Sequence, residues 1–234
     1  MMMKIKQILK IIFYIILINS FENLNAEAHI SHYKNLKKIE MEIFRNDKLI
    51  GYNYYFFKKN KNTTLVINQI KFAVNILGAT LFEVEGYGEE LYNEDQLISF
   101  NSKTTQNKKE KFVKLTLDNS IKKFKINASS YTGNADLNNV VGNWWNHKLL
   151  QTDSQISPIS GSIKKQIVTF IGKEKIELYG KTYNTEHFRL VSKDNLPDNK
   201  KLDFQIWYDK KNKMILKVSY SRMGKWEYKL KNFE

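Results

Sequence analysis

The sequence contains no cysteine, only two prolines, and only three arginines among its 38 basic residues. Without cysteine the chain can form neither a disulfide nor a lipid-modified N-terminal cysteine, so a hydrophobic core must hold the fold together. The scarcity of arginine matters because the formal net charge is +14. Lysine is poorer than arginine at bidentate contacts with phosphates and guanines, so this charge does not predict a nucleic-acid partner.

The N-terminus has the pattern of an export signal. A lysine-rich start, an apolar run and two small residues follow one another, at Lys4, Lys6, Lys10, Ile11–Ile18, Ala26 and Ala28. The run is far shorter than the about 20 apolar residues that cross a membrane, although an uncleaved anchor is the alternative. We expect a signal peptide over residues 1–26, cleaved after Ala26 or Ala28, and a periplasmic, monomeric domain over residues 27–234.

Most of the mature chain alternates polar and apolar side chains with a period of two, which is typical of β-strands. The expected strands cover residues 38–44, 49–57, 66–76, 80–92, 97–104, 111–117, 121–127, 164–171, 176–179, 183–191, 202–209, 214–220 and 225–233. Polar turns separate them. A flat sheet of this size would expose its edges, so it must curl. The sequence therefore predicts an all-β fold: an antiparallel meander of about ten or more strands, forming a half-barrel or a barrel.

The alternation stops between residues 129 and 162. Apolar residues here recur at spacings of three and four, which predicts one short helix over about residues 137–150 that covers the opening of the sheet. The stretch includes Trp144 and Trp145, two of only four tryptophans. On this helix Gly142 would cost about 1 kcal/mol relative to alanine, so the helix would need tertiary support.

The two tryptophans allow two interpretations. They plug the core, or they form one wall of an apolar cavity, and both can hold at once because each ring offers so much area to bury. We assign the anchor to Trp144 and the cavity wall to Trp145, which lies with Val141 on the far side of the expected helix. The predicted ligand-binding residues are Trp144, Trp145, Tyr54, Phe72, Val74 and Ile76.

These segments resemble a family of exported bacterial proteins known only as a domain of unknown function. The likeness rests on "GYNYYFF", "FAVNILGATLFEVEGYGEELYNEDQLISF", "NWWNHKLL" and "IWYDKKNKMILKVSY", and it extends from about Lys38 to the end of the chain. The family implies no activity. More distantly, the meander is similar to the half-barrel of periplasmic lipoprotein-localisation factors, which implies a concave sheet that holds acyl chains.

The sequence offers little catalytic chemistry. Glu83, Glu85 and His147 could in principle serve a hydrolase, but a sheet face of solvated carboxylates explains the glutamates as well. His29 and His32 are too loose a pair to predict a metal site, and no cofactor motif is present. We therefore expect a non-catalytic protein without cofactor or metal that binds a lipid or acyl chain. The alternatives are an envelope assembly factor with a packed core, which contacts an anionic surface through its lysines, and thirdly a hydrolase.

Overall fold

The computed structural model describes residues 30–197 and 200–234. The expected signal peptide, both cleavage positions and His29 lie outside the described residues. Within the described part, no helix is long and apolar enough to cross a membrane.

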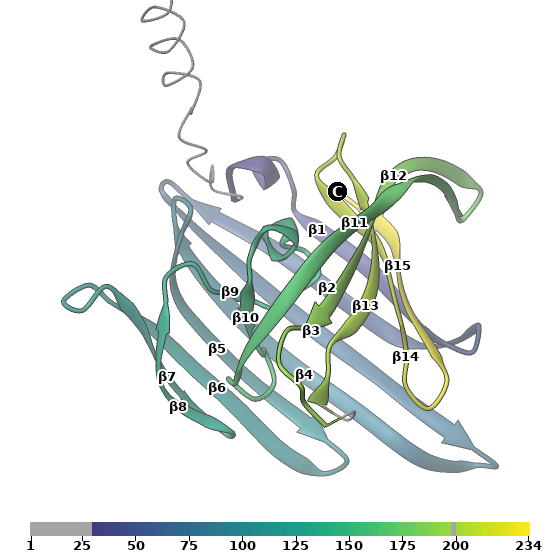
Figure 1. The fold of residues 1–234 in the computed structure, drawn as a ribbon, viewed down its shortest axis with the longest axis horizontal. Coiled ribbons are helices and arrows are strands. Elements are labelled where there is room, and N and C mark those ends of the chain that lie inside the picture. The colour runs from purple at the N-terminus through teal and green to yellow at the C-terminus, as the bar shows by residue number, and fades with distance from the viewer. Residues whose placement is uncertain (1–29, 198–199) are drawn as a thin grey trace, which may run out of the picture.

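Strands dominate the structure, as the period-two alternation predicts (Figure 1). They are β1 (Lys38–Arg45), β2 (Lys48–Asn60), β3 (Thr63–Ile76), β4 (Ala79–Asn93), β5 (Gln96–Gln106), β6 (Lys109–Asp118), β7 (Lys123–Ala128), β8 (Tyr131–Asp136), β9 (Val140–Val141), β10 (Ser154–Ile156), β11 (Ile163–Leu178), β12 (Lys181–Ser192), β13 (Asp203–Asp209), β14 (Met214–Ser221) and β15 (Lys225–Phe233). Two short 3₁₀ helices, η1 (Ile30–Tyr33) and η2 (His147–Gln151), complete the fold.

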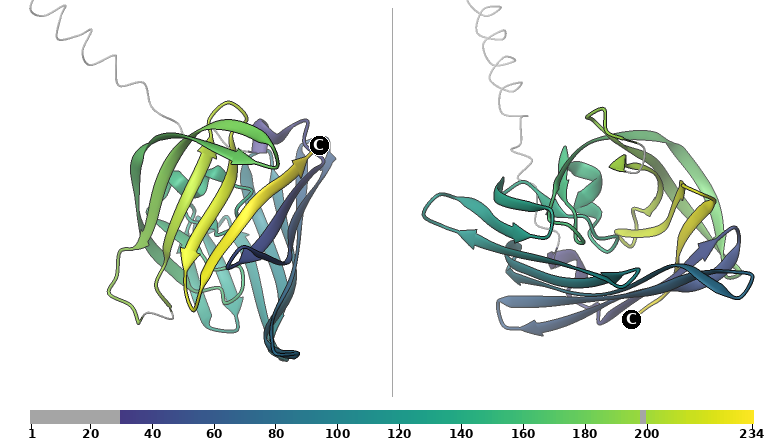
Figure 2. Two further views of the ribbon diagram at one scale, coloured as in Figure 1. Left: turned by 90° about the vertical axis from the view of Figure 1, so that its right-hand side faces the viewer. Right: turned by 90° about the horizontal axis from the view of Figure 1, so that it is seen from below.

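All the strands belong to one sheet, with β8 at one edge and β9 at the other. Strands that follow one another in sequence pair antiparallel, except that β9 and β10 run parallel and that β8 and β9, at the two edges, do not pair. In the middle of the sheet, β1 pairs antiparallel with β15. The chain therefore builds two meanders and joins them through its first and last strands. The sheet curls so that one half faces the other, and it does not close (Figure 2). The predicted half-barrel is confirmed.

One strand is longer than its alternation suggests. The predicted strands over residues 164–171 and 176–179 are a single strand, β11, whose pairing with β12 shifts register between Phe170 and Gly172. Such an irregularity inverts which face each residue takes, so the sequence pattern breaks although the backbone stays extended.

The core lies on the inner face of the curled sheet. On β2 the buried side chains are Asn53, Tyr55 and Phe57, so Tyr54 lies on the outer face, where its ring stacks against that of Tyr52 with 4.4 Å between centroids. The sequence prediction that Tyr54 lines the interior is wrong. Aromatic residues occupy both faces of this strand, so alternation alone could not identify the buried one.

The predicted helix over residues 137–150 is also wrong. Val140 and Val141 form β9, the chain then turns, and only η2 is helical. Gly142 packs so closely against the side-chain amide of Gln155 that an added Cβ atom would have to displace that side chain. The segment lies within the curve of the sheet (Figure 2). Protein surrounds it there, so Val140, Val141, Trp145 and Leu149 are buried without forming one helical face.

Candidate functional site

The segment Asn143–Asn146 is fastened to the sheet through one buried carboxylate. Glu90 of β4 is 1% exposed, and its Oε1 accepts hydrogen bonds from Nε1 of Trp145 (2.9 Å) and Nδ2 of Asn143 (2.7 Å). Its Oε2 accepts a third bond from the hydroxyl of Tyr92 (2.6 Å). Neutral donors from two distant parts of the chain thus meet on one carboxylate.

Burial disfavours the charged form of Glu90. It raises the pKa of this carboxyl above its ordinary value, against the lowering effect of the hydrogen bonds from Tyr92, Trp145 and Asn143. Glu90 is not among the site residues predicted from the sequence. The signal in the sequence is the alternation along the strand: Glu90 lies an even number of residues from Val84 and Tyr92 and so shares the inward face of β4 with them.

A second buried group holds the other side of the segment. The hydroxyl of Tyr33 donates to the backbone oxygen of Trp145 (2.8 Å), and Nδ1 of His147 lies 2.7 Å from the same hydroxyl. The hydroxyl also lies 3.1 Å from the backbone oxygen of Lys213, and Nδ1 of His147 donates to it or accepts from it according to the tautomer of the ring. The His147 ring is buried and stacks against Tyr208, with 5.4 Å between centroids. This geometry gives His147 a packing role.

Beside this anchored segment lies a cavity of about 220 Å³. Its floor is the inner face of β2 to β5, and its roof is formed by the Trp144 segment and the loops before β11 and β13. The lining comprises Asn53, Tyr55, Asn68, Ile70, Gly86, Tyr87, Gly88, Phe100, Ser102, Thr104, Gly142, Asn143, Trp144, Gln155, Pro158, Ile159, Leu202, Phe204 and Tyr228. Gly86 and Gly88 point inward on β4, and the missing side chains leave room for the cavity.

Every residue that lines the cavity is uncharged, in a chain in which 26% of residues carry charge. Aromatic rings supply much of the wall: Trp144 packs edge-on against Phe204, with 5.1 Å between centroids, and lies beside Tyr228 at 6.1 Å. The floor adds hydroxyl and amide groups. The cavity can therefore accept an apolar body and hydrogen-bond a neutral polar group.

Several of these polar groups also bond one another. Nδ2 of Asn68 donates to Oδ1 of Asn53 (2.5 Å), and Nδ2 of Asn53 donates to the hydroxyl of Tyr55 (2.8 Å). The Tyr55 hydroxyl in turn accepts the backbone N–H of Trp144 (3.2 Å). Trp144 is therefore tied to the cavity floor through its backbone while its ring forms part of the wall.

The structure separates the six predicted ligand-binding residues. Trp144, partly exposed, lines the cavity, whereas Trp145 is 1% exposed and anchored on Glu90, so the roles assigned to the two rings are reversed. Phe72 packs between Phe82 and Trp226, away from the cavity. The remaining three lie elsewhere: Val74 in the core, Tyr54 on the outer face, and Ile76 exposed at the end of β3. Sequence reasoning missed Asn53, Asn68, Phe204 and Tyr228.

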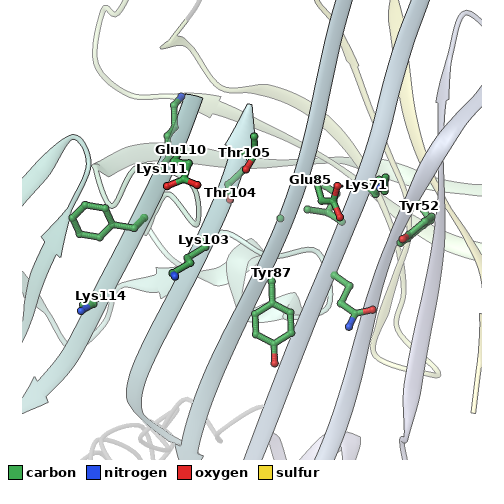
Figure 3. A pocket seen from close by; sticks show the side chains of 14 residues that line it. Tyr52, Lys71, Glu85, Tyr87, Lys103, Thr104, Thr105, Glu110, Lys111 and Lys114 are labelled. Carbon is green, nitrogen blue, oxygen red and sulfur yellow. Dashed lines mark hydrogen bonds and ion pairs between the residues drawn. The ribbon is translucent and has the colours of Figure 1, made fainter. Parts of the chain in front are cut away.

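The outer face of β2 to β6 carries a second, open hollow of about 740 Å³ (Figure 3). Lysines dominate its charged residues: Lys71, Lys103, Lys111 and Lys114 against Glu85 and Glu110. Nζ of Lys71 lies 3.0 Å from Oε2 of Glu85. The hydrogen bond to Glu89 raises the pKa of Tyr87 to about 12.

The residues suggested for a hydrolase do not meet. Glu83 and Glu85 are exposed on the outer face of β4, while His147 is buried inside the curl. Among the described residues, no three histidine, aspartate or glutamate side chains form a group that could hold a metal ion.

Residues 41–231 match the family described as "Domain of unknown function (DUF6134)". The chain belongs to this family. No curated protein matches the sequence. Among solved structures, it is similar to a "Beta-barrel-like Protein of Domain of Unknown Function DUF1849" from Brucella abortus, with a TM-score of 0.56 and 10% identity. The likeness covers 85% of this chain and 96% of that one, and at this identity it shows the fold alone. The expected membership of a family without assigned activity is confirmed.

Proposed function

We propose that this DUF6134 protein is a non-catalytic, exported carrier that binds a neutral amphipathic ligand, such as an acyl chain with an uncharged polar end. The observation that carries the proposal is the cavity beside Trp144, whose lining is entirely uncharged. The proposed location is the periplasm, and it rests on the export pattern at the N-terminus.

The chemistry of the lining selects the ligand. Aromatic and aliphatic walls favour an apolar chain, because burying apolar surface contributes about 25 cal/mol per Å². An ionised headgroup would lose its hydration and find no opposite charge on the cavity wall, which is costly. A hydroxyl, ester or amide could instead bond to Asn68, Ser102 or Thr104 on the floor.

The size of the cavity limits how much of the ligand it holds. Small-molecule sites usually span about 300–1,000 Å³, so a cavity of about 220 Å³ fits a short chain or one end of a longer lipid. Ile159 and Leu202 line the cavity from the loops of its roof and are partly exposed, so we propose that the ligand enters beside them. The half-barrel of the lipoprotein-localisation factors offers a precedent at the level of fold only.

A second candidate is an envelope assembly factor with no ligand, which acts through its basic surface. The bonds among Asn53, Asn68 and Tyr55 favour it, because a cavity floor whose polar groups already bond one another has less need of a ligand. The formal charge of +14 is consistent with an anionic partner surface.

Native mass spectrometry of the protein purified from the periplasm distinguishes the two. The carrier predicts a co-purified lipid that disappears in Gly88→Val. The added Cβ would lie 3.3 Å from the Phe100 ring and 3.6 Å from Cβ of Ser102, so the side chain takes up cavity space with a small adjustment of that ring. Valine also suits a strand better than glycine, so the fold should persist. An unliganded wild-type protein, after gentle purification, would support the assembly factor.

A further inference from the structure

The turn between β3 and β4 combines a fully exposed apolar side chain with a left-handed backbone conformation. Leu77 and Gly78 form the two-residue turn between β3 and β4, and the Leu77 side chain is fully exposed, at 102%. Its φ of 50° lies in the left-handed region, where a bulky non-glycine residue is unusual. The corresponding turns of β1–β2 and β5–β6 place Asn46 and Asn107 in this conformation, which suits asparagine.

A neighbouring turn repeats the combination. Met223 precedes Gly224 in the turn between β14 and β15, has a φ of 51° and is 81% exposed. Because β1 pairs with both β2 and β15, and Arg45 is opposite Trp226, the turns of β1–β2, β3–β4 and β14–β15 all lie at one end of the sheet. The β3–β4 and β14–β15 turns project at the lower right of Figure 1.

The rest of this end has a consistent chemistry. The β3–β4 hairpin carries no charge from Ala73 to Phe82, and Ile76 and Leu81 on it are also about half exposed. The adjoining turns supply exposed lysines, Lys48, Lys108 and Lys109, that form no ion pair among the described residues. The same end carries fewer acidic side chains: Asp47, which pairs with Lys225, and Glu110 beside Lys109. An apolar tip on an end where lysines outnumber carboxylates is complementary to the boundary between acyl chains and anionic headgroups.

We propose that Leu77 and Met223 insert into the surface of an anionic phospholipid bilayer and dock the protein there. Insertion would remove two exposed apolar side chains from water, while nearby lysines would interact favourably with the anionic headgroups. The proposal goes beyond ligand binding and does not depend on it. Membrane docking and ligand binding are compatible, because the cavity reaches toward the same end of the sheet. The Ser157–Ser162 loop contributes Ile159 to the cavity. The N–H of Ser130, in the β7–β8 turn at this end, donates to the backbone oxygen of Ser160 in that loop.

The test is flotation of the full mature protein with vesicles of phosphatidylcholine alone or mixed with phosphatidylglycerol. Variants Leu77→Asn, Met223→Asn and the double variant should remain folded, because asparagine tolerates the left-handed conformation better than leucine or methionine. Tyr179→Asn is the matched control: Tyr179 also precedes a glycine at a positive φ, but in the β11–β12 turn at the opposite end of the sheet.

We expect wild type and Tyr179→Asn to bind the mixed vesicles and to be released by salt. The double variant should bind about tenfold or more weakly, with an unchanged melting temperature. Equal binding by wild type and the double variant would overturn the proposal, as would failure of wild type to bind. Sedimentation without vesicles tests the alternative that a second copy of the protein covers this tip. Self-association that depends on Leu77, without vesicle binding, would support that alternative and overturn the proposal.

Discussion

The indole N–H of Trp145 donates to Oε1 of Glu90 across 2.9 Å, and both residues are almost completely buried. This bond joins the segment inside the curl to the fourth strand of the sheet. The two adjacent tryptophans therefore have different roles. Trp145 anchors the segment, and the neighbouring ring of Trp144 lies against the cavity.

Replacing Glu90 by alanine should lower the free energy of unfolding by about 3 kcal/mol or more, because three buried donors would lose their acceptor. Glu90→Gln should cost much less, since its amide oxygen can still accept from Trp145 and Asn143. Urea titrations of both variants measure this difference. Equal losses for alanine and glutamine would show that the hydrogen bonds to Glu90 are unimportant.

The raised pKa of Glu90 also predicts how stability depends on pH. Between the unfolded pKa, near 4.5, and the higher folded pKa, the native state binds more protons than the unfolded state. Burying Glu90 therefore costs no charge-related stability below the unfolded pKa, and this cost grows as pH rises through the folded pKa. The unfolding free energy of wild type should fall relative to that of Glu90→Gln as pH increases across this window. A constant difference between the two proteins would contradict the raised pKa.

The two tryptophans should respond differently to truncation. Trp145→Ala deletes a fully buried ring and a hydrogen bond, so it should cost at least about 3–5 kcal/mol. Trp144→Ala removes a partly exposed ring from a cavity wall and should cost clearly less. Paired denaturant titrations measure both. Equal and large losses would indicate that Trp144 is simply part of the packed core.

The fold class could be predicted from the sequence because a strand that is buried on one face alternates apolar and polar side chains. Prediction from the sequence failed where burial is not one-sided. The residues around Trp144 and Trp145 are enclosed by protein, so apolar spacing suggested a helix where the chain forms a short parallel bridge, turns and η2.

The cavity was only partly predictable for a related reason. Trp144 could be chosen because a tryptophan pair at a break in the alternation is conspicuous. Asn53 and Asn68 look like surface residues, and their inward orientation follows from the parity of Tyr55 and Val66 once the register of β2 and β3 is known. Phe204 and Tyr228 come from distant strands, and only the curl of the sheet brings them over the cavity.

Export makes a separate prediction about the N-terminus. N-terminal sequencing of the protein from its own cells should find Glu27 or His29 as the first residue, depending on whether cleavage follows Ala26 or Ala28. Intact Met1 in a soluble cytoplasmic fraction would refute the export prediction.

The central claim is that the uncharged cavity beside Trp144 binds a neutral amphipathic ligand, and a matched titration tests it most directly. Decanol and decanoate share a ten-carbon chain but differ in headgroup charge, and binding of each can be followed by tryptophan fluorescence in wild type, Gly88→Val and Trp144→Ala. We predict saturable binding of decanol by wild type, clearly weaker binding of decanoate at neutral pH, and loss of the decanol response in both variants while they remain folded. Tighter binding of decanoate, or a decanol response that survives in folded Gly88→Val, would contradict the claim.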